Sequence, residues 1–129
     1  MSQQPKNFLI TKPPVSITII MVCVAIYLLQ NLSPQLALWP LHSGYFQPWQ
    51  LVSYAFLHGG FNHLFFNMFA LWMFGLPVEK IWGSKRFVSY YLICVLGAGL
   101  IQLLVQHLSG NIYPTIGASG AVFGLLLAY

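Results

Sequence analysis

A serine, a histidine and an asparagine are the residues of this 129-residue chain whose types and spacing could do chemistry. Ser119 lies in GASGAVFG (residues 117–124), and His63 and Asn67 lie four residues apart in FNHLFFNMFALWMFG, on one face of a helix. A serine hydroxyl attacks acyl groups when a base takes its proton, and N–H donors stabilise the resulting oxyanion. Hydrogen bonding between helices is the alternative role for His63 and Asn67.

The place of the serine within its helix bears on whether it packs or reacts. Small residues recur at helical spacing, a stripe that suits close packing against another helix: Gly117, Gly120, Ala121, Gly124 and Ala128. If the helix starts near Ile116, Ser119 points roughly 160° away from Gly117 and lies in the first turn, where backbone N–H groups lack partners. That environment suits an oxyanion, and an N-cap or packing role is the alternative.

The composition is that of a membrane protein. The chain is 58% hydrophobic and 5% charged, whereas a soluble domain carries about a quarter charged residues. The charged residues fall near the N-terminus and in one central stretch: Lys6, Lys12, Glu79, Lys80, Lys85 and Arg86. They form no basic patch, so the net charge of +4 indicates membrane topology and no nucleic-acid partner. Cys23 and Cys94 lie in apolar segments and are assigned neither a disulfide nor a metal.

Four apolar segments are expected to enter the bilayer as helices: residues 15–32, 62–77, 87–108 and 116–129. The first is expected to be a retained anchor rather than a cleaved signal peptide, because no A-x-A-like site follows it. The last rises only about 21 Å as a helix, so we expect the chain to stop inside a span. The predicted organisation is a cytoplasmic tail over residues 1–14 and a transmembrane domain over residues 15–129.

The basic residues before the first span and after the second place both of those ends on the cytoplasmic side. The connections at residues 33–61 and 109–115 then face outward. The first is rich in aromatic residues and is expected to lie partly in the outer membrane interface. His63, Asn67 and Ser119 all enter their helices from this outer side, so we expect them at similar depth.

Three motifs in this order resemble those of the rhomboid family of intramembrane serine proteases. They are HGGFNHLFFN with His58, His63 and Asn67, EKIWGSKRF with Glu79, Gly83 and Phe87, and GASG with Gly117 and Ser119. The resemblance covers about residues 39–129, and the first span fits by position only. It implies an all-α, polytopic helical bundle in which four spans are present, the fourth incomplete, and the fifth and sixth missing.

The resemblance also implies roles for these residues. Ser119 is the implied nucleophile, and His63, Asn67 and the backbone N–H of Ser119 form the implied oxyanion hole. Structural support is implied for His58, Glu79, Gly83 and Gly117. Family members cut single-span membrane proteins near the outer end of the span, which implies transmembrane substrates, a lipid bilayer, no metal or other cofactor, and a multi-pass protein of the plasma (inner) membrane.

The chain departs from the family pattern in two ways. Many members have Trp-Arg where this chain has Trp49-Gln50. The family base is a histidine on the sixth span, and none of His42, His58 and His107 matches it. We therefore expect this chain to lack the base and to be inactive alone. The alternatives are a non-catalytic relative that binds transmembrane helices and a small channel or transporter subunit, although the polar groups line no path across the membrane.

Overall fold

The computed structural model describes residues 12–29 and 34–129, and over these residues it is helical, without a β-strand. The helices in chain order are α1 (Val15–Leu29), the 3₁₀ turns η1 (Pro34–Leu36) and η2 (Leu41–Ser43), α2 (Gln50–Ser53), the 3₁₀ turn η3 (Tyr54–Phe56), α3 (Phe61–Ala70), the π-helical segment η4 (Leu71–Gly75), α4 (Leu76–Trp82), α5 (Ser84–Ser109) and α6 (Ser119–Ala128). The predicted all-α bundle is confirmed. Most of the predicted tail at 1–14 and the end of the first predicted span lie outside the described residues.

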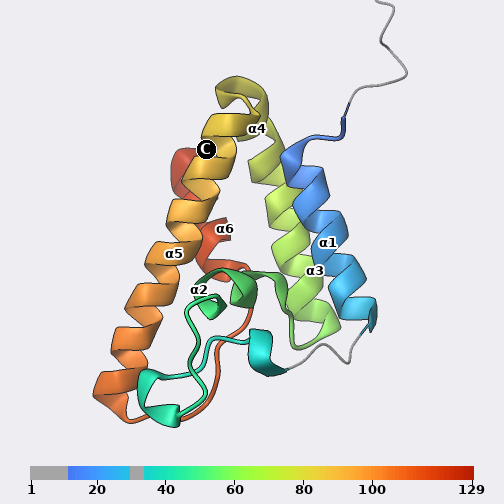
Figure 1. Ribbon diagram of the computed structural model, residues 1–129. Helices are drawn as coiled ribbons and strands as arrows, with labels where there is room; N and C mark the ends of the chain where they lie inside the picture. The colour runs from blue at the N-terminus through green and yellow to red at the C-terminus, as the bar shows by residue number, and fades with distance from the viewer. Residues whose placement is uncertain (1–11, 30–33) are drawn as a thin grey trace, which may run out of the picture.

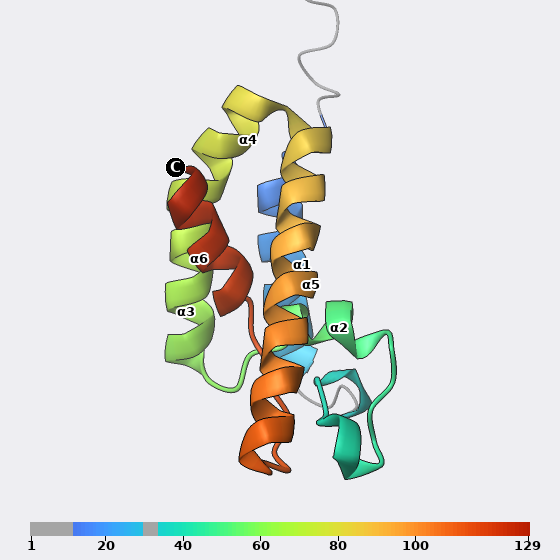
Figure 2. The same ribbon diagram turned by 90° about the vertical axis from the view of Figure 1, so that its left-hand side faces the viewer.

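The helices form a bundle in which α6 packs between α3 and α5, with α1 beside α3 (Figures 1 and 2). The α1–α3 connection, described over residues 34–60, folds against one end of this bundle, and α4 lies at the other end (Figure 1). Two continuous helices, Phe61–Trp82 and Ser84–Ser109, are long and apolar enough to cross a membrane, and α1 and α6 are shorter apolar helices. The bundle thus holds α6 where its first residue meets α3 and the α1–α3 connection.

The helix that begins at Phe61 continues past the predicted end of its span at residue 77 and stops only at Trp82. Pro77 lies inside it, and a proline has no N–H and clashes with the carbonyl four residues earlier. The π-helical segment η4 ends two residues before this proline, and such a segment accommodates a proline without ending the helix. Gly83, with φ 85°, then turns the chain into α5.

The predicted stripe of small residues is confirmed for Gly120 and Gly124 in α6, and it is wrong for its first member, Gly117. A Cβ on Gly120 would overlap the Ala98 Cβ, and one on Gly124 would overlap the Cys94 Sγ, so these glycines let α6 and α5 pack closely. Gly117 precedes the helix, because α6 begins at Ser119 and not near residue 116. The predicted angle between Gly117 and Ser119 therefore does not apply.

Candidate active site

Ser119 is the first residue of α6, and its hydroxyl faces α3. The Ser119 Oγ lies 3.4 Å from the His63 Nε2. The N–H of Val122 bonds to the carbonyl of Ala118 at 3.0 Å, and the N–H groups before it are those that a helix start leaves without intrahelical partners. The hydroxyl thus sits beside free backbone donors and the positive end of the helix dipole.

Asn67 lies one turn after His63 on α3 and is buried, with 7% of its surface exposed. Its side chain makes no hydrogen bond to another described residue, although α3 packs against α6. An amide that holds two helices together needs a partner on the second helix. The structure therefore places His63 against Ser119, and the N–H donors of the Asn67 amide have no partner among the described residues.

Gly117 is the glycine that the contact between His63 and Ser119 requires. Its φ is 117°, a conformation that L side chains rarely adopt, and its N–H donates to the Tyr54 carbonyl at 2.9 Å. A Cβ at this position would lie 2.6 Å from Cε1 and 2.8 Å from Nε2 of His63. The absence of a side chain at Gly117 is therefore what lets the His63 ring reach Ser119.

His58 lies in the connection just before α3, buried behind His63. Its Nε2 accepts a hydrogen bond from the Ala118 N–H at 3.4 Å, and the two imidazole rings meet edge to face with centroids 5.0 Å apart. Burial, together with the nearby His63, lowers the pKa of His58 to about 4. The ring is therefore neutral at pH 7, which is the form that can accept from Ala118 and fix the residue before Ser119.

Lowering the pH from 7 to 4 is expected to destabilise the fold through His58 by about 3 kcal/mol. The folded-state pKa of about 4 lies below the ordinary value of 6.5, so the unfolded chain binds the proton first and stability is lost as the pH falls through this window. In His58→Gln, an amide replaces the titrating acceptor, and the melting temperature should fall less steeply with pH than in wild type. Equal slopes for the two proteins would contradict this role.

Glu79 and Gly83 lie at the opposite end of the bundle from Ser119 and join three helices there. The Glu79 carboxylate accepts hydrogen bonds from the backbone N–H groups of Val15 and Ser16 at 2.7 and 2.8 Å, which caps the start of α1. It also accepts from the Ser16 and Ser84 hydroxyls at 2.6 and 2.7 Å. These contacts link α1, α4 and the first residue of α5. Neither Glu79 nor Gly83 lies near Ser119.

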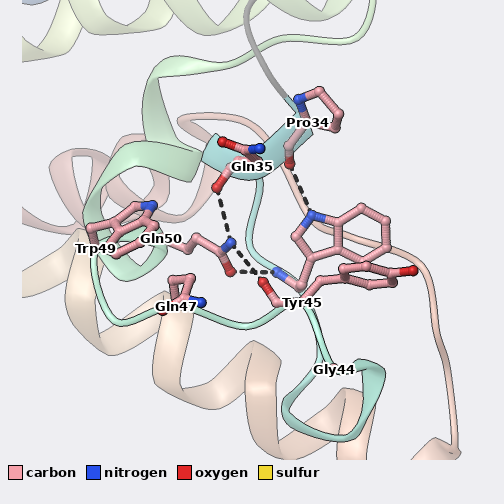
Figure 3. A pocket seen from close by; sticks show the side chains of 8 residues that line it. Pro34, Gln35, Gly44, Tyr45, Gln47, Trp49 and Gln50 are labelled. Carbon is pink, nitrogen blue, oxygen red and sulfur yellow. Dashed lines mark hydrogen bonds between the residues drawn. The ribbon is translucent and has the colours of Figure 1, made fainter.

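Gln50, interpreted from the sequence only as a missing arginine, is a fully buried hydrogen-bonding centre of the α1–α3 connection. Its Oε1 accepts from the Trp39 N–H at 3.2 Å, and its Nε2 donates to the carbonyls of Gln35 and Tyr45 at 2.9 and 3.0 Å (Figure 3). The amide lines a cavity of about 520 Å³ together with Trp49 and Tyr45, and Figure 3 shows these side chains. One side chain thus ties three turns of the connection together.

Gln50→Ala is expected to destabilise the protein by about 2 kcal/mol or more, because it removes three hydrogen bonds and leaves buried partners unpaired. Thermal or denaturant unfolding in detergent measures the change. Gln47→Ala is the matched control, since Gln47 lines the same cavity from an exposed position. Similar losses in the two variants would refute a central role for Gln50.

Gln106 was not identified from the sequence and holds the segment that leads to the serine. It is 1% exposed, and its Nε2 donates to the Tyr113 carbonyl and the Thr115 hydroxyl, both at 3.1 Å. Thr115 in turn forms an isolated antiparallel bridge with Leu38, with N–H to carbonyl distances of 2.9 Å in both directions. A sequence signal for Gln106 was available. The buried residues of α5 recur every four positions up to residue 103, and Gln106 is the one polar residue that follows them on the buried face.

The structure brings neither His42 nor His107 into contact with Ser119. They lie beside each other instead, where η2 meets the last turn of α5, with ring centroids 6.0 Å apart.

The chain is similar to known rhomboid proteins over most of its length. The Rhomboid domain matches residues 45–129. A RHOMBOID-like protein 5 of Arabidopsis thaliana is 41% identical over 78 residues, which are 60% of this chain and 25% of that protein. The Rhomboid protease GluP of Bacillus subtilis (strain 168) is 42% identical over 78 residues, covering 60% and 14%. The Rhomboid protease GlpG of Yersinia pestis (strain Pestoides F) is 31% identical over 115 residues, covering 81% and 41%.

The chain spans less than half the length of these relatives. The domain match covers well over half of this chain, and it includes α3, α5 and α6, which carry or position His63, Asn67 and Ser119. The chain belongs to the rhomboid family of membrane proteins.

Proposed function

We propose that the full-length protein containing this chain is an intramembrane serine endopeptidase that cleaves single-span membrane proteins near the outer end of the span. The observation that supports this most directly is the Ser119 hydroxyl at the first residue of α6, 3.4 Å from the His63 Nε2. The glycine at position 117 supports it as well, because the site tolerates no side chain there.

In the proposed reaction, the Ser119 Oγ forms a bond to the carbonyl carbon of the substrate peptide while a base takes the hydroxyl proton. The resulting oxyanion accepts hydrogen bonds from the backbone N–H of Ser119 and from the side chains of His63 and Asn67. The base then gives its proton to the leaving amine, and water releases the acyl group. We propose that the base is the family's histidine on a helix that this chain does not include.

The direct test is reconstitution of the full-length protein in liposomes with a single-span reporter, followed by mass spectrometry of the products. We expect a cut near the outer end of the reporter span, with the N-terminus of the protease on the cytoplasmic side. The 129-residue chain alone should give no product. A full-length protein that binds the reporter without cutting it would instead support a non-catalytic relative.

Asn67→Ala is expected to lower kcat of the full-length protein by up to roughly 10²-fold, since one oxyanion donor is lost. Asn62→Ala is the matched control, because Asn62 is an exposed asparagine on the first turn of the same helix. Initial rates on the reporter and the melting temperature are both measured. Full activity with a lowered melting temperature in Asn67→Ala would favour a purely structural amide.

A further inference from the structure

We propose that His42 and His107 form a two-histidine binding site for a late first-row divalent metal ion, with Zn²⁺ as the expected ion. The two residues come from separate elements, η2 in the α1–α3 connection and the last turn of α5. These elements meet at the end of the bundle opposite α4 (Figure 1). The proposal concerns this end of the bundle and is independent of the proposed protease chemistry.

The separation of the two rings fits one shared ion. A zinc–nitrogen bond of about 2.0–2.1 Å puts each ring centroid about 3.2 Å from the ion, so two imidazoles on one ion have centroids roughly 5–6 Å apart. The His42 and His107 centroids are 6.0 Å apart, and their planes are inclined at 59°. In the proposed site, rotation about the side-chain bonds aims one nitrogen from each ring at a common point.

Both imidazoles are available as ligands. Each side chain is exposed, and neither makes a hydrogen bond to another residue in the part of the chain that the structure describes. The backbone that carries His42 is fixed from within. The Ser43 hydroxyl donates to the Pro40 carbonyl at 2.7 Å and accepts from the Tyr45 N–H at 3.1 Å. The backbones of both ligands are therefore fixed before an ion binds, that of His42 by this turn and that of His107 by helix α5.

The donor set selects the class of metal. Neutral imidazole suits Zn²⁺, Cu²⁺ and Ni²⁺, whereas Mg²⁺ and Ca²⁺ prefer carboxylate and carbonyl oxygens. The only acidic residue of the sequence, Glu79, lies in α4 at the far end of the bundle. Residues 12–29 and 34–129 contain no group of three or more side chains suited to holding a metal ion. Water would complete the coordination, which makes this an open site that exchanges its ion.

A bound ion would join the α1–α3 connection to α5. His107 directly follows Gln106, whose amide holds Tyr113 and Thr115 in the segment that leads to Ser119. Because the site exists only when the chain is folded, zinc should raise the melting temperature. The effect is on the stability of this end of the bundle rather than on the reacting atoms.

The test uses the full-length protein without a polyhistidine tag, stripped with a chelator and titrated with ZnCl₂ by calorimetry in detergent. We expect one zinc per molecule, a rise of several degrees in the melting temperature and no response to MgCl₂. His42→Ala and His107→Ala should each lose the binding and the rise. Because both side chains are exposed, the melting temperatures of these variants without zinc should match wild type.

A spectroscopic measurement separates this site from binding elsewhere. Cu²⁺ bound to wild type should show hyperfine coupling to two nitrogens in its electron paramagnetic resonance spectrum, and to one or none in the single variants. His63→Ala is the control and should bind zinc as wild type does. The proposal is overturned if wild type binds no zinc, if a variant that carries both His42→Ala and His107→Ala binds it unchanged, or if His63→Ala loses it.

Discussion

Ser119→Ala in the full-length protein is expected to abolish cleavage of a single-span reporter and labelling by a fluorophosphonate probe. In the proposed mechanism, the Ser119 Oγ forms the acyl bond, and removing the nucleophile of a serine protease costs on the order of 10⁶ in kcat. The fold should survive, because the Ser119 hydroxyl is joined to His63 Nε2 by a long hydrogen bond of 3.4 Å, whose removal costs little. Gel fluorescence after labelling and the melting temperature measure the two effects separately.

Ser89→Ala is the matched control for this experiment. Ser89 is an exposed serine on α5 whose hydroxyl donates to the Lys85 carbonyl one turn earlier. It should keep full labelling and activity. Equal labelling of Ser119→Ala and wild type would refute Ser119 as the nucleophile, whatever the family membership of the chain.

Gly117→Ala is expected to lower activity by roughly 10²-fold and to lower stability as well. The new methyl group would lie within 2.6 Å of the His63 ring at a φ of 117°, so the ring or the backbone beside Ser119 must move. Such backbone strain costs about 1–3 kcal/mol, and displacement of an oxyanion donor by about 1 Å costs roughly 10²-fold in rate. Probe labelling and unfolding report the two losses.

Gly97→Ala is the matched control for the glycine. Gly97 lies within α5, and a Cβ there would meet no atom within 4 Å. Alanine is favoured over glycine in a helix by about 1 kcal/mol, so this variant should be as stable as wild type or slightly more so, with full activity. A Gly117→Ala protein that behaved like Gly97→Ala would show that the approach to His63 does not matter for catalysis.

The helices and their packing seam were predictable because they depend on local composition. A long apolar run with few charges predicts a membrane span whatever the rest of the chain does. The four-residue spacing of Gly120 and Gly124 places them on one helix face. The sequence also predicted that Ser119 lies in the first turn of its helix, among backbone N–H groups that lack intrahelical partners. The predicted helix start near residue 116 was wrong, because α6 begins at Ser119. The local sequence does not show whether Gly117 lies in the turn before the helix or in its first turn.

The hydrogen bonds of Gln50 and Gln106 were not predictable because each joins positions separated in the sequence. Gln50 pairs with backbone atoms up to fifteen residues away, and the segment that Gln106 holds pairs with Leu38. A glutamine in an apolar stretch signals burial with a partner, but the partner is fixed only when the helices pack.

By itself, the sequence determined a helical membrane protein and a short set of polar residues able to support acyl transfer, because hydropathy and helical periodicity act over neighbouring residues. Only the tertiary structure decided which of these residues meet. It placed His63 against Ser119, His58 against the Ala118 N–H, and His42 beside His107. The physical reason is that these contacts depend on how α3, α5, α6 and the α1–α3 connection pack, and that packing is a property of the whole chain.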